Sequence, residues 1–296
     1  MRSDSKTFTL GFSPCPNDTF IFHALVKGLV GTHGFSFEEH LMDVEQLNQQ
    51  ALAAAFDVTK VSFHLFGHIR GNYTLLPSGA ALGRGCGPLL VSNKECPVGA
   101  LRHKPVALPG RYTTAALLLR LFAPQMDNLV YMPFDRIMPA VASGEVAAGV
   151  IIHESRFTFR DHGLFKLADL GEWWEGDTGC PIPLGGIVAK SSLGSEVIDT
   201  LGRLIAESIK YAYANPQAPR EYIREHSQEM SDEVCDAHIG LYVNDFSLDL
   251  GEEGRRAVAV LMERGEGAGL LPRSGGPFYR RFLGGLCTTL LCALLG

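Results

Sequence analysis

His153 is the side chain whose position in this sequence best suits proton transfer. It follows Val150, Ile151 and Ile152, an apolar, β-branched run that predicts a short buried strand. In an open α/β sheet, ligands bind just outside the carboxyl ends of the strands. A histidine with its ordinary pKa of about 6.5 can accept or release a proton near neutral pH. A structural histidine that only hydrogen-bonds at a strand end is the alternative, and position alone favours it.

A rigid turn follows the first predicted strand, which covers residues 7–12. The turn Ser13–Asp18 contains two prolines, and either Asn17 or Asp18 can cap a helix that begins near Thr19. The start of a helix binds anions because its first backbone N–H groups lack acceptors. We therefore place Asn17 and Asp18 in a candidate cleft, although the turn by itself favours an ordinary helix cap.

Two more predicted strands end in polar residues. Lys60 and Ser62 close the run DVTKVS, where a cation and a hydroxyl can bind a carboxylate or carbonyl of a substrate. Thr113 and Thr114 follow a predicted strand at 106–108 and open a strongly helical segment. Their hydroxyls and the free N–H groups of a helix start suit a carboxylate, and a plain helix cap is the alternative.

Other patterns argue against a metal site and a phosphate loop. His64 and His68 are four residues apart, but no acidic or thiol ligand stands beside them, so we predict a wet helix face and no metal. The glycines between residues 83 and 87 lack the G-K-[ST] ending and indicate close backbone packing or a crossover between lobes. Cys15 and Cys86 fall near the predicted cleft, and because no base is visible beside either, both are interpreted as packing residues.

The order of the predicted elements indicates how the chain is organised. Strands and helices alternate through residue 190, and helices complete the chain. This order predicts an α/β fold of two lobes, with the second inserted into the first. We assign residues 1–98 and 188–279 to the first lobe and residues 99–187 to the second. Residues 280–296 form an atypical apolar tail that is shorter than the ~20 residues of a membrane span, and we expect a non-functional extension.

Composition and charge narrow the class of protein. The 296 residues carry a net charge of -6, which argues against a nucleic-acid surface, because such surfaces are basic. Seven cysteines without a C-x-x-C pattern fit reduced thiols better than a disulfide framework. The first residues lack the apolar segment of an export signal. We therefore expect a cytoplasmic protein that binds a small molecule and does not insert stably into a membrane.

Six segments of the sequence carry a more specific signal. They are, in order, GFSPCPNDTFIFHALV, DVTKVSFH, SGAALGRGCGPLLV, PGRYTTA, GEVAAGVIIHESRFTF and VNDFSLDLGEEG. Together they resemble the 1,4-dihydroxy-6-naphthoate synthase family of the futalosine route to menaquinone. The resemblance implies a periplasmic-binding-protein type II-like fold and a lyase that acts on cyclic dehypoxanthine futalosine without a cofactor.

The resemblance also implies roles for particular residues. His153, inside the motif IHESRF, would be the proton acceptor that starts cleavage and release of the sugar-derived part of the substrate. The substrate-contacting segments of the family fall on Lys60, Val61, Ser62, Thr114 and Ala115, with Thr113 beside them. Arg156, in the same motif as His153, is a further candidate for the cleft.

Two other functions remain open from the sequence. A non-enzymatic receptor for a small anion can share this fold, although receptors usually need export. A chorismate dehydratase of the same pathway is the second alternative, and the SPCPNDTF and IHESRF motifs favour the naphthoate synthase. The sequence does not set the oligomeric state, and a homodimer is one possibility.

Overall fold

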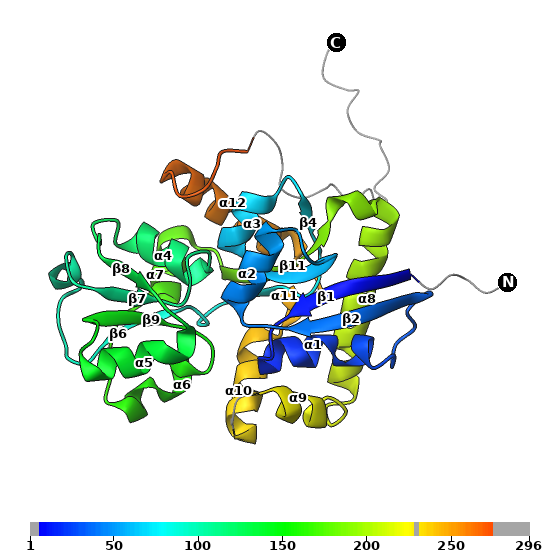
Figure 1. Ribbon diagram of the computed structural model, residues 1–296, viewed down its shortest axis with the longest axis horizontal. Helices are drawn as coiled ribbons and strands as arrows, with labels where there is room; N and C mark the ends of the chain where they lie inside the picture. The colour runs from blue at the N-terminus through cyan, green and yellow to red at the C-terminus, as the bar shows by residue number, and fades with distance from the viewer. Residues whose placement is uncertain (1–5, 228–230, 275–296) are drawn as a thin grey trace, which may run out of the picture.

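The computed structural model describes residues 6–227 and 231–274, which fold into two α/β lobes that lie side by side (Figure 1). Each lobe is built around its own β-sheet. This arrangement confirms the two-lobed α/β fold expected from the alternation of strands and helices. The apolar tail at 280–296 lies outside the described residues.

The first lobe contains a six-stranded sheet in the order β2-β1-β3-β11-β4, with β5 also paired to β11. Its strands are β1 (Lys6–Phe12), β2 (Phe35–Leu41), β3 (Val58–Ser62), β4 (Tyr73–Leu75), β5 (Ala81–Gly83) and β11 (Ile182–Lys190). Its helices are α1 (Pro16–Val26), α2 (Val44–Leu52), α3 (Phe63–Ile69), α8 (Ser195–Ala214), α9 (Arg220–His226), α10 (Asp232–Tyr242), α11 (Asp245–Leu248) and α12 (Gly251–Gly267).

The second lobe contains a five-stranded sheet in the order β10-β6-β9-β7-β8. Its strands are β6 (Leu89–Ser92), β7 (Val106–Leu108), β8 (Leu129–Tyr131), β9 (Ala148–Ile151) and β10 (Phe165–Asp169). Its helices are α4 (Thr114–Phe122), α5 (Phe134–Ser143), α6 (Ser155–Thr158) and α7 (Leu170–Thr178).

The two sheets repeat one strand arrangement. β1 lies between its parallel neighbours β2 and β3, just as β7 lies between β8 and β9. An antiparallel strand follows in each sheet, β11 beside β3 and β6 beside β9. The start of α1 therefore corresponds to the start of α4, and the end of β3 corresponds to the end of β9. No internal repeat stands out in the sequence, yet the structure places the polar turns at equivalent points of the two lobes.

Sheet membership places both lobe boundaries earlier than the sequence analysis did. Strand β6, within the predicted first lobe 1–98, belongs to the second sheet, and β11 rejoins the first sheet from Ile182, before residue 188. The chain crosses between β5 and β6 and returns between β10 and β11. An apolar run such as that of β6 packs equally well in either sheet, so local pattern does not show which sheet it joins.

A pair of glycines lets the two crossing segments touch. A Cβ added to Gly87 would lie 2.3 Å from the backbone of Gly171, a distance at which any side chain clashes. Gly87 precedes β6 and Gly171 follows β10, so the contact joins the segments by which the chain enters and leaves the second lobe. This close approach confirms the prediction of tight backbone packing around residues 83–87.

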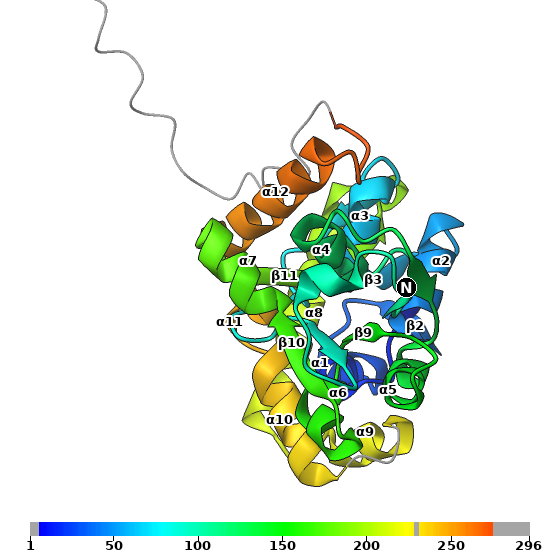
Figure 2. The same cartoon turned by 90° about the vertical axis from the view of Figure 1, so that its left-hand side faces the viewer.

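Helices cover both faces of each sheet and so bury the strands. In Figure 1, α1 lies below the strands of the first sheet and α2, α3 and α12 lie above them, while α8 runs down the right-hand side of this lobe. Figure 2 shows α4 and α7 above the second sheet and α5 and α6 below. Alternate residues of a strand point to opposite faces. Leu10 and Ile187 accordingly pack with α1 and α8, whereas Val61 and Val188 pack with α3 and α12.

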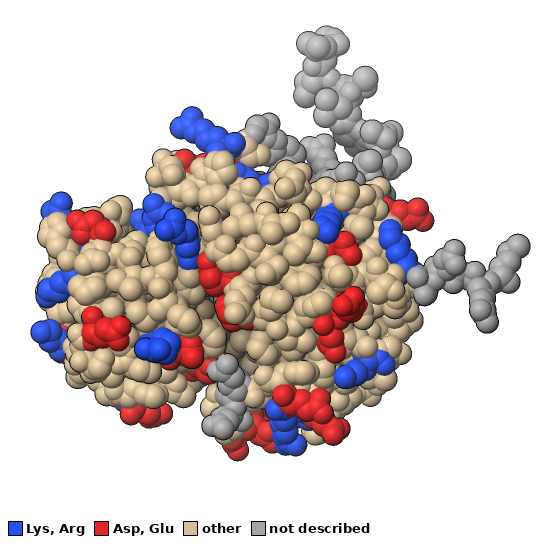
Figure 3. Space-filling model, in the orientation of Figure 1, with Lys and Arg blue, Asp and Glu red and all other residues tan. Residues whose placement is uncertain are grey.

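The surface carries few strong features on the face that Figure 3 shows. Lysines and arginines are scattered among acidic side chains and do not gather into a basic patch on that face. Among the described residues, no helix combines the length and the apolar character needed to cross a membrane.

Candidate active site

A cavity lies between the two lobes. Its lining combines the polar turns that the sequence analysis singled out. The first lobe contributes the predicted residues Asn17, Asp18, Lys60 and Ser62. The second lobe contributes the predicted residues Thr113, Thr114, Ala115 and His153. The repeated fold thus brings together side chains that are far apart in the sequence.

The start of α1 differs from the sequence prediction. The helix begins at Pro16, and its N-cap is Cys15, which makes no side-chain capping bond. Asn17 and Asp18 therefore lie inside the first turn and cap nothing. Proline is favoured at the first helical position because its missing N–H has no partner there anyway. The side chain of Asp18 is free to turn towards the cavity instead.

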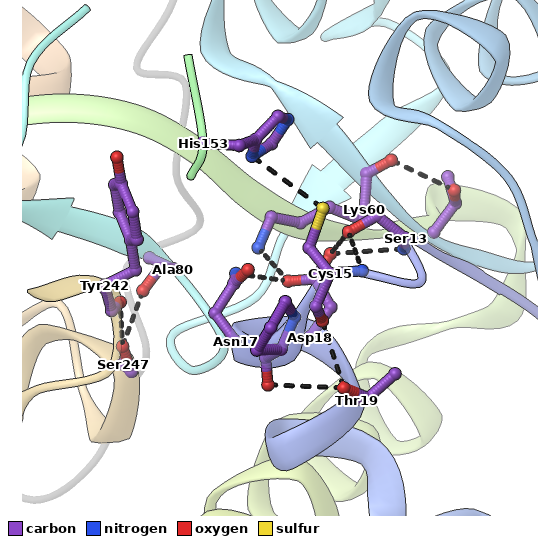
Figure 4. A network of polar contacts seen from close by, with 12 residues as sticks. Ser13, Cys15, Asn17, Asp18, Thr19, Lys60, Ala80, His153, Tyr242 and Ser247 are labelled. Atoms are coloured by element: carbon purple, nitrogen blue, oxygen red, sulfur yellow. Dashed lines mark hydrogen bonds and ion pairs between the residues drawn. The ribbon is translucent and has the colours of Figure 1, made fainter. Parts of the chain in front are cut away.

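Asp18 is the centre of a buried polar network, which Figure 4 shows. One carboxylate oxygen, Oδ2, accepts hydrogen bonds from the N–H and the hydroxyl of Ser13, at 3.2 and 2.7 Å. The other, Oδ1, accepts from Nδ2 of Asn17 at 2.8 Å and from Nζ of Lys60 at 2.7 Å. Asp18 and Lys60 are 1% and 5% exposed, so the ion pair is largely taken out of water.

The predicted Lys60–Ser62 segment divides between cavity and core. Lys60 lines the cavity, but its charge is paired with Asp18, which argues against its acting as a free cation for a substrate carboxylate. Val61 points to the other face of β3 and packs in the core. Ser62 lines the cavity, and its hydroxyl oxygen accepts a hydrogen bond from Asn48 at 3.1 Å. Its hydroxyl proton has no acceptor among the described residues.

His238 forms part of the cavity wall, and the sequence analysis missed it. Because Nδ2 of Asn17 donates to Asp18, Oδ1 of Asn17 must be the acceptor for Nε2–H of His238, at 3.0 Å. This bond fixes the proton of the neutral ring on Nε2. Burial, with His153 and Lys60 nearby, lowers the pKa of His238 to about 3. Its Nδ1 is left as a buried acceptor without a partner in the described part of the chain.

Tyr242 is a second cavity residue that sequence reasoning did not single out. It lies one turn after His238 on α10, and the two ring centroids are 4.7 Å apart. Burial raises the pKa of its phenol, which therefore stays neutral. One signal was available: a histidine four residues before a tyrosine on one helix face places both on the same side. That signal is weak, because such pairs are common in ordinary cores.

The start of α4 offers hydrogen-bond donors to the cavity. Thr113 is its N-cap, as predicted, and its hydroxyl accepts from the N–H of Ala116 at 3.3 Å. Within the described residues, the N–H groups of Thr114 and Ala115 have no acceptor. A helix start with two free N–H groups that faces a cavity is suited to a carboxylate.

The hydroxyl of Thr114 ties the start of α4 to the first lobe. It donates to the carbonyl of Leu184 at 2.6 Å and accepts from the N–H of His64 at 3.3 Å. Nδ1 of His64 donates to the carbonyl of Thr113 at 3.1 Å. The prediction of a wet helix face for His64 and His68 is therefore wrong for His64, which is buried and whose pKa burial lowers to about 4.

His153 lies where the sequence predicted, just beyond β9, and it bridges the cavity and an adjoining groove. Its backbone has φ of 56°, a left-handed conformation that is uncommon outside glycine. Nδ1 lies 3.8 Å from Sγ of Cys15, as Figure 4 shows. Burial lowers the pKa of His153, but Cys15, Glu154 and Asp18 more than offset this and raise it to about 9.

The contact with His153 changes the interpretation of Cys15. The sequence shows no base beside this cysteine, and we interpreted it as a packing residue. The structure places a histidine of the other lobe against its sulfur, so Cys15, although buried, has a partner that the sequence analysis did not identify. Cys86 is also buried, and burial raises the pKa of its thiol to about 12. That thiol is neutral and fits the predicted packing role.

Arg156 does not line the cavity, in contrast to its place among the cleft candidates. Its guanidinium pairs with Asp169 at 2.7 Å and donates to the carbonyl of Gly87. Asp169 also caps α7 by accepting from the N–H of Gly171 at 2.9 Å. Arg156 therefore braces the two crossing segments. Across the described ranges, no group of three or more His, Cys, Asp or Glu side chains could hold a metal.

Comparison with known proteins adds to this geometry. A protein-family model described as menaquinone biosynthesis matches residues 8–267. A protein of Thermus thermophilus named 1,4-dihydroxy-6-naphtoate synthase is 51% identical over 274 residues, which cover 93% of this chain and 99% of that protein. A protein of Streptomyces coelicolor with the same name is 44% identical over 276 residues, which cover 92% of this chain and 97% of that protein.

Solved structures agree on the fold. A Candida albicans gene product, described as exhibiting the generic periplasmic binding protein structural fold, aligns with a TM-score of 0.66. The alignment covers 90% of this chain and 92% of that chain at 14% identity. At this identity the likeness shows the fold alone. It confirms the periplasmic-binding-protein-like fold expected from the sequence.

Proposed function

Because the chain belongs to the menaquinone biosynthesis family, we propose that it is an enzyme with 1,4-dihydroxy-6-naphthoate synthase activity. The observation that carries the proposal is the cavity between the lobes, which a proton-transfer group and a candidate carboxylate site both line. Both relatives that carry this name match the chain over nearly its whole length.

We propose cyclic dehypoxanthine futalosine as the substrate, and the start of α4 as the site for its carboxylate. The free N–H groups of Thr114 and Ala115 can donate two hydrogen bonds to one carboxylate, and the dipole of the nine-residue helix favours a negative charge there. The hydroxyl of Ser62 supplies a further donor from the first lobe. Lys60 has a supporting role, since its charge already stabilises Asp18.

We propose His153 as the proton acceptor. Its Nδ1 faces Cys15, so the opposite nitrogen, Nε2, is the atom available to a substrate. Removal of a proton from the substrate by Nε2 would begin cleavage and release of the sugar-derived part. Neutral donors in the wall, such as the Tyr242 phenol, are suited to stabilise negative charge that develops on oxygen. This chemistry needs proton transfer and charge stabilisation, and we propose that it proceeds without a cofactor.

The experiment that tests the proposal is a turnover assay. The purified protein is incubated with cyclic dehypoxanthine futalosine without added metal or nucleotide, and products are followed by mass spectrometry. Appearance of 1,4-dihydroxy-6-naphthoate is the expected result. A parallel incubation with chorismate tests the dehydratase alternative, and tight binding without product in either incubation would support a receptor. A cytoplasmic location and a homodimer stay predictions, which fractionation and sedimentation would check.

A further inference from the structure

The contact between Cys15 and His153 joins the two lobes in the groove that adjoins the cavity. Cys15 lies at the start of α1 in the first lobe, whereas His153 follows β9 in the second. Sγ of Cys15 and Nδ1 of His153 are 3.8 Å apart, which is within hydrogen-bond range for sulfur. Since each residue is held by a different sheet, the contact exists only while the lobes are together.

The geometry of this contact decides which nitrogen of His153 can act as a base. An imidazole accepts a proton on one nitrogen only if the other nitrogen carries the hydrogen. A sulfur that accepts a hydrogen bond from Nδ1–H leaves the lone pair on Nε2. This is how an anionic partner orients the histidine of a hydrolase triad.

We propose that Cys15 is a positioning residue, whose sulfur accepts the Nδ1 proton of His153 and so presents Nε2 to the substrate when the lobes close. The inference rests on the proposed function, because it assigns His153 a partner for proton transfer. It does not make the sulfur a nucleophile: no bond to sulfur forms or breaks. The proton of Nδ1 stays on His153 throughout, and only Nε2 gains one.

Other charged groups around His153 bear on its titration. Asp18, at the start of α1, and Glu154, next in the chain, both raise the pKa of His153. His238 faces it from α10 with a parallel ring at 6.1 Å, but that ring is neutral. The adjoining groove that His153 also lines carries Asp43, Asp135 and His226. Of all these groups, Cys15 alone makes a side-chain hydrogen bond with His153 among the described residues.

The direct test is the titration of His153 by NMR in protein with labelled histidine, with His153→Gln used to assign the signal. In the wild type, His153 should titrate near pH 9. In Cys15→Ser, which lacks the sulfur whose contact raises the pKa of His153, we expect the midpoint to fall by at least one pH unit. Cys15→Asp places a carboxylate beside the ring and should return the midpoint towards the wild-type value. An unchanged midpoint in Cys15→Ser would overturn the proposal.

A kinetic test adds a second readout. The neutral form of His153 is the base, so kcat/KM in the wild type should rise with pH and level off near pH 9. In Cys15→Ser this limb should move to lower pH, and the plateau should fall about 10-fold because the ring is less well oriented. Cys96→Ser, at a half-buried thiol outside the cavity, is the control and should match the wild type. A Cys15→Ser profile that lies over the wild-type profile contradicts the proposal.

The two tests separate the two claims. If the purified protein does not turn over cyclic dehypoxanthine futalosine, the proposed function fails, yet the NMR titration still measures whether Cys15 controls His153. Thermal unfolding of Cys15→Ser shows whether the variant is folded. If it is not, Cys15→Ala titrated in the same way replaces it, with the same expected fall of the midpoint.

Discussion

The equivalent turns of the two lobes hold their polar groups in opposite ways. In the first lobe, Asp18 and Lys60 bond to each other and to neighbouring side chains, so no charge is left over. In the second lobe, the N–H groups of Thr114 and Ala115 are free, and His153 keeps one nitrogen for a ligand. One strand order thus supports two uses: the first lobe's network mainly stabilises the site, and the second lobe's groups mainly act on the substrate.

The two cavity histidines show the same contrast. Their rings are nearly parallel, with 15° between the planes, yet the pKa of His153 is raised to about 9 and that of His238 is lowered to about 3. His153 faces anionic groups, whereas His238 faces Lys60 and His153 itself. Burial is common to both, so the sign of the neighbouring charges decides the outcome.

The largest expected effect is on stability and concerns the first lobe. Lys60→Met leaves Asp18 buried without its cation, and loss of one partner of a buried ion pair costs about 3–5 kcal/mol. Urea unfolding measures the change. Lys190→Met, which breaks the more exposed pair with Asp57 in the same sheet, is the control and should cost at most about 1 kcal/mol. Equal losses for both variants would break the contrast between the lobes.

The next effect is on activity and concerns the second lobe. His153→Gln removes the proposed base, and we expect kcat/KM to fall by 100-fold or more, or about 3 kcal/mol of transition-state stabilisation. The variant should remain folded, with a cooperative transition in urea. His103→Gln, at an exposed histidine whose side chain is 70% accessible, should leave both quantities unchanged. Near-normal turnover by His153→Gln would show that another group is the base.

A third effect is the response of stability to pH. The folded-state pKa of His238 lies below its unfolded value of about 6.5, so the unfolded chain binds more protons between that value and about 3. Stability is then lost as the pH falls through this window, by about 2 kcal/mol at pH 5. In His238→Asn, the free energy of unfolding should fall less as the pH is lowered.

His153 contributes to stability with the opposite sign. Its folded-state pKa is raised, so its contribution is fully present below about pH 6.5 and is lost as the pH rises towards 9. Unfolding curves between pH 5 and pH 9 check both signs. If His153→Gln is less sensitive to acid than the wild type and His238→Asn is not, the assignment of the two histidines is reversed.

The smallest effects concern substrate binding. Ser62→Ala and Thr114→Val each remove a hydroxyl at the cavity, and we expect KM to rise about 5-fold, or about 1 kcal/mol, with little change in kcat. Thr114→Val also loses the hydrogen bond to Leu184 that ties the two lobes together. Its KM should therefore rise more than that of Ser62→Ala. Steady-state kinetics decide this, and a fall in kcat at constant KM would place the hydroxyl in the transition state instead.

Local sequence patterns predicted the site residues of the second lobe better than those of the first lobe. Thr113 caps its helix as expected, because the cap is set by residues within one turn. The cap at Asn17 or Asp18 was wrong, since the side chain of Asp18 is drawn away by Lys60, which is remote in the sequence. For the same reason, His238 was missed and Cys15 was interpreted as a packing residue without a partner. Their partners belong to other elements, and one sequence read locally carries no record of such contacts.

The insertion of one lobe into the other also orders events during synthesis. The second sheet, from β6 to β10, is complete in the growing chain before β11 is made. Strand β11 lies between β3 and β4, so until it emerges both of those strands keep an unpaired edge. We therefore expect the second lobe to fold first and the sheet of the first lobe to be completed only after β11 is made. Proteolysis of ribosome-bound chains that end just before β11 would test this order. The expected result is that only the second lobe is protected from cleavage.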